Sequence, residues 1–455
     1  MRRSRVATGV GAACLVAAAS VSLADAFVVP AQGSRCSLGR GARSNVHMSE
    51  AAEGDAPLTI PRSLFKKKRL EIPHEMGVGT MAWGDEEAGF VSDPKQRRKQ
   101  DKFNIKDLQG AFDALVSKGL VFFDTSDMYA YKSMDDGLSA EQLLGKFEDE
   151  SPEDRVMVAA KYMPVLWTNW LIGGPFRGGR RAVVKSLERS LDRLGMAYVD
   201  LYQVHFPFPY IGGMDALAEG MAMAYNRGLC RAVGVSNFNA QQTRDFKEKL
   251  EKHGVELFSN QFEYSLINQD KADDGTLAEC KRLGVTPIAH TPLGKGLATG
   301  VYTASNPTGG KMGAPKYGFR DLEPLMPVHI ALAEVAKMVM GRLNQDEDRE
   351  AGEPLRVVTT TQVALNYIRA KGLVPIPGVK TKKEALEVAG CLGWHLRAED
   401  VEILDEAYKA YKKGTGGRTV KRRKAPDRTK RALISRSPKK SRGTGWIEDL
   451  NKGYD

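Results

Sequence analysis

The chain has 455 residues, 67 Lys and Arg against 56 Asp and Glu, and a formal net charge of +11. This length can bury a large core, and one barrel domain of about 250 to 400 residues with insertions would use most of it. Three of the five cysteines, Cys230, Cys280 and Cys391, lie beyond residue 50, and their wide spacing excludes a disulfide framework and a CxxC zinc site.

The first 56 residues resemble a two-part targeting leader. In residues 1–26, three arginines precede an apolar stretch, and an A-x-A cleavage site ends at Ala26, as in a signal peptide. Residues 27–56 begin as a basic segment rich in Ser and Gly, which is typical of a transit peptide. The pair resembles the plastid-targeting leaders of algae with secondary plastids. We therefore expect a plastid (chloroplast) location, with plain secretion as the alternative.

The positive charge belongs to the two ends of the chain. Residues 414–443 contain twelve Lys and Arg and one acid, a local charge of +11, and residues 1–50 add +4, so the remainder carries −4. The tail over 414–455 lacks apolar periodicity and is predicted to be disordered. A solvated tail without function is the simplest interpretation. Contact with an anionic membrane surface or with nucleic acid is the alternative.

A single barrel domain is predicted over residues 57–413 and starts with a hairpin. Residues 66–72 and 76–80 are expected to pair before the first barrel strand, to close the bottom of the barrel and to lead into it. A charged insertion follows over residues 85–104.

Short apolar runs that each end in a polar residue predict buried parallel strands. The runs cover residues 121–123, 156–160, 199–204, 232–235, 257–260 and 285–289, and the eighth strand is expected over 373–376. Polar residues at the carboxyl ends of such strands are typical of an α/β fold, the (β/α)8 or TIM barrel, whose active site lies on that face.

Helical periodicity separates these strands. The predicted helices cover residues 105–118, 140–147, 180–194, 216–226, 240–253, 275–283, 328–340, 361–371 and 382–390. A glycine stands between a helix and the next strand at five places, where a left-handed C-cap is needed. These are Gly119, Gly195, Gly228, Gly254 and Gly284.

Four residues near strand ends form a candidate catalytic group: Asp124, Tyr129, Lys161 and His205. A tyrosine with a pKa of about 10 is a poor acid at neutral pH, so acid catalysis by Tyr129 needs a cation such as Lys161 to lower that pKa. Asp124 would keep Lys161 charged, and His205 would orient a carbonyl oxygen against the phenol. Taken singly, these residues also fit a structural ion pair, a core histidine and a surface tyrosine. Together they favour carbonyl reduction.

Seven segments resemble the aldo-keto reductase family in their order and spacing. They read FDTSDMY, AK, DLYQVH, GVSNF, NQFEY, TPLG and PIPG, and they begin at Phe123, Ala160, Asp200, Gly234, Asn260, Thr291 and Pro375. The resemblance spans residues 76–408, and the segment 390–394 favours the plastid-type plant and algal branch. It implies that Tyr129 is the general acid, that Asp124, Lys161 and His205 complete a tetrad, and that the cofactor is NADPH.

The same resemblance implies a cofactor site along the barrel mouth. Ser236, Asn237 and Gln261 would bind the nicotinamide carboxamide, and His290 would lie under the ring. The pyrophosphate would be covered by Thr291, Pro292, Leu293 and Gly294. The adenosine phosphate would lie against Gly378, Lys380, Thr381, Lys382 and Glu384, where lysines and a hydroxyl suit a 2′-phosphate.

Three positions depart from the family pattern. His290 replaces a larger stacking aromatic residue, so stacking is expected to weaken or to depend on pH. Glu384 stands where the family has Arg or Gln, and Val388 where it has Asn, which removes polar contacts to the adenine. We therefore expect looser cofactor binding than is typical, with the NADPH preference resting on the lysines.

Loops above the barrel mouth would select the substrate. Trp83, Met163, Trp167 and Phe206 form an apolar, aromatic set that suits an extended or ring-containing carbonyl compound. Trp167 has packing of the outer loops as an equal alternative.

The sequence therefore predicts a monomeric NADPH-dependent aldehyde or ketone reductase that needs no metal. The alternative is a nicotinamide-binding regulatory or redox-sensing subunit with little turnover, which the three departures and the basic tail favour and the intact tetrad opposes. A Schiff-base aldolase using Lys161 is a third reading. Asp124 opposes it, because a protonated lysine is not nucleophilic.

Overall fold

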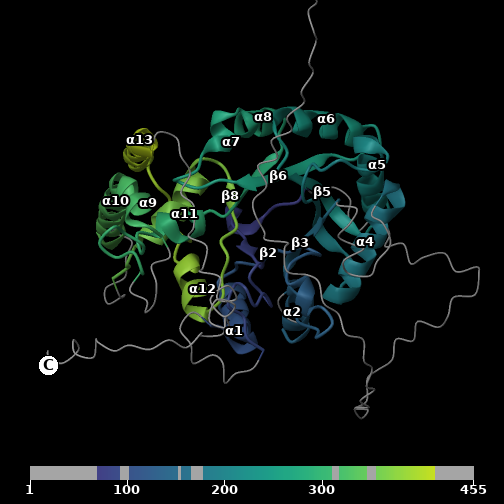
Figure 1. Ribbon diagram of the computed structural model, residues 1–455, viewed down its shortest axis with the longest axis horizontal. Coiled ribbons are helices and arrows are strands. Elements are labelled where there is room, and N and C mark those ends of the chain that lie inside the picture. The colour runs from purple at the N-terminus through teal and green to yellow at the C-terminus, as the bar shows by residue number, and fades with distance from the viewer. Residues whose placement is uncertain are drawn as a thin grey trace, which may run out of the picture. The chain divides into compact units, whose positions relative to one another are not determined.

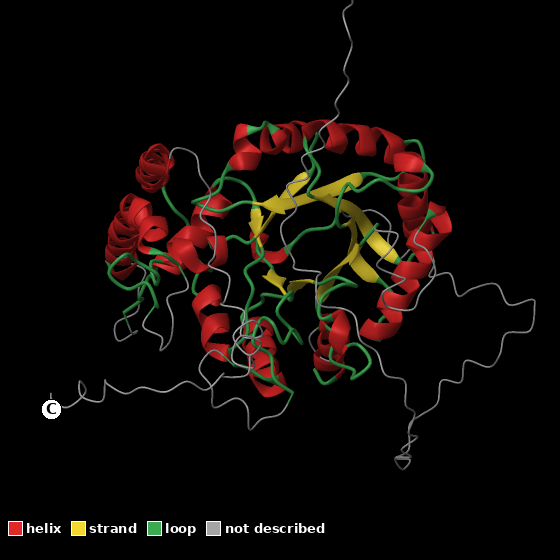
Figure 2. Cartoon of the chain, in the orientation of Figure 1, coloured by secondary structure: helices red, strands yellow, loops and turns green. Residues whose placement is uncertain are grey.

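Eight parallel strands lie beside one another in chain order in the computed structural model, which describes residues 69–92, 102–151, 155–164, 178–309, 317–345 and 355–415. The strands are β1 (Val78–Gly79), β2 (Phe122–Asp124), β3 (Met157–Tyr162), β4 (Val199–Val204), β5 (Cys230–Ser236), β6 (Leu257–Glu263), β7 (Thr286–His290) and β8 (Val374–Pro375). A parallel bridge between Gly79 and Gly378 joins the first strand to the segment after the last. Figure 2 shows the strands inside a ring of helices. The predicted (β/α)8 barrel is confirmed.

The helices occupy the segments between and after the strands (Figure 1). They are α1 (Ile105–Val116), α2 (Ala140–Asp149), α4 (Gly179–Leu194), α5 (Gly213–Asn226), α6 (Ala240–Glu251), α7 (Asp270–Asp273), α8 (Thr276–Arg282), α9 (Phe319–Leu322), α10 (Met326–Asn344), α11 (Thr360–Ala370), α12 (Lys382–Ala389) and α13 (Ala398–Thr415). Capping boxes start several of them: Asn104, Ser139, Asn239 and Thr359 each accept a backbone N–H two or three residues further on.

The predicted glycine caps are present. Gly119, Gly195, Gly228, Gly254 and Gly284 all have positive φ, and Gly195 ends α4 in the left-handed region with its N–H bonded to Leu191 O. A side chain at such a position costs about 1 kcal/mol or more, which explains the choice of glycine.

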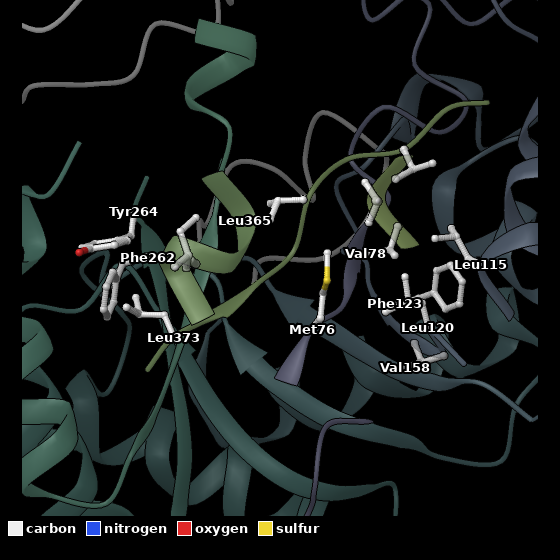
Figure 3. Packing of buried hydrophobic residues seen from close by; sticks show 14 of the residues in the cluster. Met76, Val78, Leu115, Leu120, Phe123, Val158, Phe262, Tyr264, Leu365 and Leu373 are labelled. Atoms are coloured by element: carbon white, nitrogen blue, oxygen red, sulfur yellow. The ribbon is translucent and has the colours of Figure 1, made fainter. Parts of the chain in front are cut away.

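Two apolar layers hold the barrel together. The inner layer fills the barrel with side chains from the strands and from the segments before β1 and after β8. It consists of Leu70, Phe122, Ala159, Leu201, Ala232, Phe258, Ile288, Val374 and Ile376. The outer layer lies between sheet and helices and includes Val78, Phe123, Val158 and Leu115 (Figure 3). Truncating a core phenylalanine such as Phe122 to alanine costs about 3 to 5 kcal/mol. The rigid barrel bottom can therefore support an active site at the opposite end.

The predicted N-terminal hairpin is wrong for the residues that the structure describes. Residues 69–72 form no strand, Pro73–Glu75 is a short 3-10 helix, and Val78–Gly79 is itself the first barrel strand, parallel to β2. The apolar pattern was real, but its cause is burial: Leu70 packs against the inner layer and Val78 against the outer one. Residues 66–68, the leader over 1–56 and the tail from residue 416 lie outside the described residues.

Helix α13 was not predicted. It packs against α10, and Arg342 on α10 pairs with the fully buried Asp400 on α13. The combined stretch Phe319–Asn344 is apolar and long enough to cross a membrane by length and composition. Here its residues Val328, Leu332 and Val335 are buried in the outer layer, as expected of a helix in a folded domain.

The three cysteines of the barrel are buried and free. Burial raises the pKa of Cys280 to about 11 and raises the pKa of Cys230 and of Cys391 further.

Candidate active site

Lys161 joins the members of the predicted catalytic group. Its Nζ donates to Asp124 Oδ2, to Thr125 O at 3.1 Å and to Tyr129 Oη at 3.2 Å. The strand register pairs Asp124 with Ala159, two residues before Lys161 on β3. The carboxylate and the ammonium therefore lie at the same end of the barrel. Asp124 is 2% exposed and Lys161 1%. A buried charge pair of this kind is stable only when both groups are fully hydrogen-bonded, which these contacts provide.

Burial sets the protonation of this group. It raises the pKa of Tyr129 above its usual value, although Lys161 pulls in the opposite direction. Burial also disfavours the charged form of Lys161, but Asp124 and Tyr129 outweigh it and raise the Lys161 pKa overall. Lys161 lowers the pKa of Tyr129 as expected, but burial outweighs this effect and the net shift is upward. The phenol therefore keeps its proton beside a charged lysine.

Two glutamines hold the other oxygen of Asp124. Gln261 Nε2 donates to Asp124 Oδ1 at 2.7 Å and Gln203 Nε2 at 3.1 Å. Gln203 was missed, although strand alternation puts it on the same side of β4 as His205, two residues later. Gly234 on β5 makes room for it, because a Cβ there would lie 3.1 Å from Gln203 Cγ and 2.4 Å from Ser259 Oγ.

His205 follows β4 and lies against the other members of the group. Its ring meets Tyr129 edge-on with 5.9 Å between centroids, and Phe206 stacks on its other side at 4.9 Å. Nδ1 lies 3.2 Å from Ser126 Oγ, a partner that the sequence did not reveal. Burial, then Lys161 and His290, lower the pKa of His205 well below its usual range. The ring is therefore neutral at physiological pH.

The residues assigned to the nicotinamide form one connected cluster at the ends of β5, β6 and β7. Asn237 Nδ2 donates to His205 O and to Ser236 Oγ, both at 3.1 Å, and Asn237 N donates to Gln261 O at 2.7 Å. His290 bonds Asn237 Oδ1 through Nε2 at 3.2 Å and Thr291 Oγ1 through Nδ1 at 3.0 Å. Asn237 and Thr291 both have left-handed backbones, at φ 63° and 54°.

His290 links the side chains of Asn237 and Thr291. Burial, followed by Lys161 and Lys295, lowers the pKa of His290 to about 4. The ring is neutral near pH 7, so the pH dependence expected of a charged His290 moves to acid conditions.

The segment assigned to the pyrophosphate folds as a tight turn. Thr291, Pro292 and Leu293 lead into a 3-10 segment, Gly294–Thr299, and Gly294 N donates to Thr291 O at 2.9 Å. Gly294, Lys295 and Gly296 are all left-handed, and Lys295 is exposed. Successive backbone N–H groups in such turns favour anions. Lys295 was not singled out in the sequence, although it directly follows the TPLG segment.

The adenosine segment lies at the start of α12. Thr381 caps this helix, and the Glu384 carboxylate accepts the Lys380 N–H at 2.7 Å. Glu384 therefore shapes the loop that carries the lysines, while Lys382 and Lys383 are exposed. Val388 is buried in the outer layer and contributes packing. Gly378 lies in the bridge to Gly79, at the closing seam of the barrel.

The predicted substrate residues separate into three groups. Trp83 is fully buried, packs against Phe123 and Phe147 and donates from Nε1 to Val379 O, so its assignment to the pocket is corrected. A side chain with no exposed surface has none to offer a substrate. Phe206, which stacks on His205, and Met163, two residues after Lys161, are partly exposed. Phe208 adds a further ring 5.3 Å from Phe206. Trp167 lies outside the described residues.

Within the described ranges, no cluster of three His, Cys, Asp or Glu side chains could hold a metal ion.

Comparison with known proteins decides the family. The model of the aldo/keto reductase family matches residues 75–409. The chain belongs to this family. It is 33% identical over 363 residues to the chloroplastic pyridoxal reductase of Arabidopsis thaliana, covering 78% of this chain and 88% of that one. This likeness agrees with the plastid-type branch predicted from the sequence.

A solved structure of a relative shares the fold of this aldo-keto reductase. The glycerol dehydrogenase of Gluconobacter oxydans superposes with a TM-score of 0.55 at 21% identity, covering 75% of this chain and 95% of that one. An aldo-keto reductase from Klebsiella pneumoniae, solved in complex with NADPH, has a TM-score of 0.48 at 22% identity and covers 73% and 90%.

Proposed function

We propose that this aldo-keto reductase uses NADPH to reduce an aldehyde or ketone to the alcohol, with Tyr129 as the general acid. The observation that carries the proposal is the buried contact of Lys161 with both Asp124 and Tyr129 Oη. A neutral phenol next to a fixed cation can give a proton to a carbonyl oxygen, because the cation stabilises the phenolate that forms. Asp124, held by two glutamines, keeps the cation in place.

The residues around the mouth fit NADPH. Asn237 and Ser236 offer amide and hydroxyl groups near the tetrad, the left-handed turn at Gly294–Gly296 offers backbone N–H groups, and exposed Lys295 and Lys382 offer positive charge. In this order, the amide and hydroxyl groups suit the nicotinamide, the backbone N–H groups suit the pyrophosphate, and the lysines suit the 2′-phosphate. When bound, the cofactor supplies hydride to the carbonyl carbon.

We further propose a planar, aromatic aldehyde of the pyridoxal type as substrate. Phe206 and Phe208 form a partly exposed aromatic surface that continues from the His205 ring. Ring stacking of this kind contributes about 0.5 to 1.5 kcal/mol beyond area burial. The chloroplastic relative named for pyridoxal supports the same substrate class.

The regulatory-subunit alternative rests on the basic tail and on the three departures from the family pattern. Two of them have structural roles here, since Glu384 orders the lysine loop and Val388 packs in the core. The Schiff-base alternative has less support, because the raised pKa of Lys161 keeps it protonated.

A plastid location and a monomeric state remain part of the proposal. The leader-like composition of residues 1–56 and the chloroplastic relative support the location. Import of the full chain into isolated plastids, with loss of the leader on a gel, tests it.

The decisive experiment measures NADPH oxidation with pyridoxal and with simple aromatic aldehydes. Tyr129→Phe should lose about 10²- to 10⁴-fold in kcat/KM while still quenching tryptophan fluorescence on binding NADPH. Tyr131→Phe, two residues along and outside the tetrad, is the matched control and should retain activity. Full activity of Tyr129→Phe would refute the assignment of Tyr129. Failure of the unmodified protein to bind NADPH would favour a non-catalytic role for the chain.

A further inference from the structure

Three large apolar side chains are exposed at the start of α10. Phe319, the first residue of α9, is 58% exposed, and Met326 and Ile330 on α10 are 58% and 60% exposed. Phe319–Asn344 forms one unbroken helical stretch, in which residues four and seven positions apart share a face. Phe319, Met326 and Ile330 therefore form a stripe on the outer face of this stretch, which we call the apolar stripe.

The apolar stripe has a polar margin without net charge. Arg320, Glu323, Glu334 and Lys337 are exposed beside it, and their charges cancel. Single exposed apolar residues are common on protein surfaces, whereas a contiguous set with a polar margin commonly marks an interaction site. Any attraction of this face to a charged partner has to come from another part of the chain.

The end of α13 lies beside the apolar stripe. Helices α10 and α13 run in opposite directions, because Arg342 near the end of α10 pairs with Asp400 near the start of α13. At the other end of this helix pair, a Cβ at Gly414 would lie 4.0 Å from Pro324 Cβ, two residues before Met326. Figure 1 shows α10 and α13 next to each other at one side of the barrel. The chain therefore leaves α13 next to the apolar stripe.

The residues that follow α13 in the sequence are strongly basic. Residues 414–443 contain twelve Lys and Arg and one acid. Their first cluster, residues 421–424, begins six residues after Thr415, so the length of the chain alone keeps Lys421 within about 22 Å of the helix end. Positive charge is thus tethered beside the apolar stripe.

We propose that the apolar stripe and the basic segment 414–443 together bind the surface of an anionic lipid bilayer. The stripe enters the boundary between headgroups and acyl chains, and the Lys and Arg side chains contact lipid phosphates. Stable attachment by such weak elements takes two signals, and the chain places an apolar and an electrostatic signal next to each other.

The structure favours a bilayer surface over two other modes of binding. Nucleic acid would satisfy the basic segment but would leave the apolar stripe in water. Insertion across the bilayer is opposed by the inner face of α10, where Val328, Leu332 and Val335 are buried in the outer layer of the barrel. The helix therefore lies along the bilayer surface.

Sedimentation with vesicles measures the attachment of the full chain. We expect binding to an equal mixture of phosphatidylcholine and phosphatidylglycerol that weakens as salt rises, and much weaker binding to phosphatidylcholine alone. Met326→Ser with Ile330→Ser should lower the partition coefficient about tenfold. A loss at least as large, with most of the salt dependence removed, is expected of Lys421→Gln, Arg422→Gln, Arg423→Gln and Lys424→Gln together.

Leu355→Ser with Val357→Ser is the matched control for the stripe. Both residues are exposed apolar side chains, and they lie at the other end of α10, where the Asn344 side chain bonds the backbone of Arg356. This variant should keep the partition coefficient of the unmodified chain. An equal loss in the control and the stripe variant, or no loss in the stripe variant, would overturn the proposal.

A dye on the stripe separates its role from that of residues 1–26, whose apolar stretch can bind lipid by itself. Ile330→Cys, combined with Cys14→Ser and Cys36→Ser, takes an environment-sensitive dye at one position, because the three remaining thiols are buried. The emission should shift to the blue with the mixed vesicles. The same dye at His253→Cys, an exposed site after α6, should not shift. Bound protein without a shift at position 330 would overturn the proposal.

Other occupants of the stripe give different results. A second copy of the chain would shift the emission at position 330 without vesicles, as the protein concentration rises. Nucleic acid as the partner would appear as binding of duplex DNA by a chain that does not bind the vesicles. Either result would overturn the proposal. Carbonyl reduction is not measured in these experiments, so a failure of attachment leaves the proposed function intact.

Discussion

The two ends of the proposed cofactor site use charge in opposite ways. At the catalytic end, Asp124 and Lys161 are almost fully buried, and each has fixed protein partners. At the adenosine end, Lys382, Lys383 and Glu384 lie at the surface of a helix start. The first group is preorganised and shielded from salt, whereas the second acts through water and is weakened by salt. The comparison teaches that chemistry and cofactor choice can be altered separately in this chain.

Breaking the buried pair should have the largest effect. Lys161→Met should lower kcat/KM by about 10²- to 10⁴-fold and the free energy of unfolding by about 3 to 5 kcal/mol, because Asp124 is left charged and unpaired. Steady-state rates and urea unfolding measure the two quantities. Replacing both partners, as Asp124→Leu with Lys161→Met, should recover stability but no activity. Unchanged stability in Lys161→Met would contradict the proposed role of the pair.

Acid should have the second-largest effect, by lowering the free energy of unfolding through His290 and His205. The folded-state pKa of His290 is about 4, below its ordinary value of about 6.5, so the unfolded chain binds more protons between these pH values. Stability is therefore full above about pH 6.5 and falls towards pH 4, by up to about 3 kcal/mol for His290, with His205 acting in the same direction. Chemical denaturation at several pH values measures the slope. His290→Gln should flatten it and His253→Gln, at an exposed site, should not.

NADPH binding at the exposed, adenosine end should weaken as salt rises. Lys380→Ala with Lys382→Ala should weaken NADPH binding about tenfold in low salt and leave NADH binding unchanged, because only NADPH carries the 2′-phosphate. Fluorescence titrations at low and high salt measure this difference, which should shrink as salt rises. Lys337→Ala, an exposed lysine on α10, is the control. Equal losses for both cofactors would place the lysines elsewhere in the site.

The smallest effect is expected at Glu384. Glu384→Gln removes a negative charge near the lysines but keeps an oxygen that can accept the Lys380 N–H. We expect NADPH affinity to rise by about twofold, within the range of a single screened surface charge. Glu384→Ala loses the backbone contact as well, so it should gain less. If Glu384→Ala bound NADPH more tightly than Glu384→Gln, the loop would not depend on this carboxylate.

Much of the barrel was predictable because burial on both faces of a parallel sheet leaves a plain signal. Apolar runs such as 199–204 became strands, and the residues that end them meet at one rim. The grouping of Asp124, Lys161 and His205 in space followed from the same rule, since these residues lie close to the ends of their strands.

Contacts between residues far apart in the sequence could not be predicted. Gln203 contacts Asp124 and Ser126 contacts His205 only in the folded chain, and nothing in the local sequence of either residue indicates the contact. The same holds for Trp83, where an aromatic residue after a strand resembles a pocket wall but packs into the core. The direction of the Tyr129 pKa shift also depended on burial, which spacing along the chain does not give.

The burial of the three cysteines determines how readily their thiols can be oxidised. Because burial raises the pKa of Cys230, Cys280 and Cys391, almost none of each is thiolate at neutral pH. Peroxide and alkylating agents attack thiolates, so these positions should react slowly in the folded barrel. Oxidation of these three thiols would then have to wait for unfolding. A rapid thiol-based response of the native barrel to the redox state of its surroundings is therefore not expected at Cys230, Cys280 or Cys391.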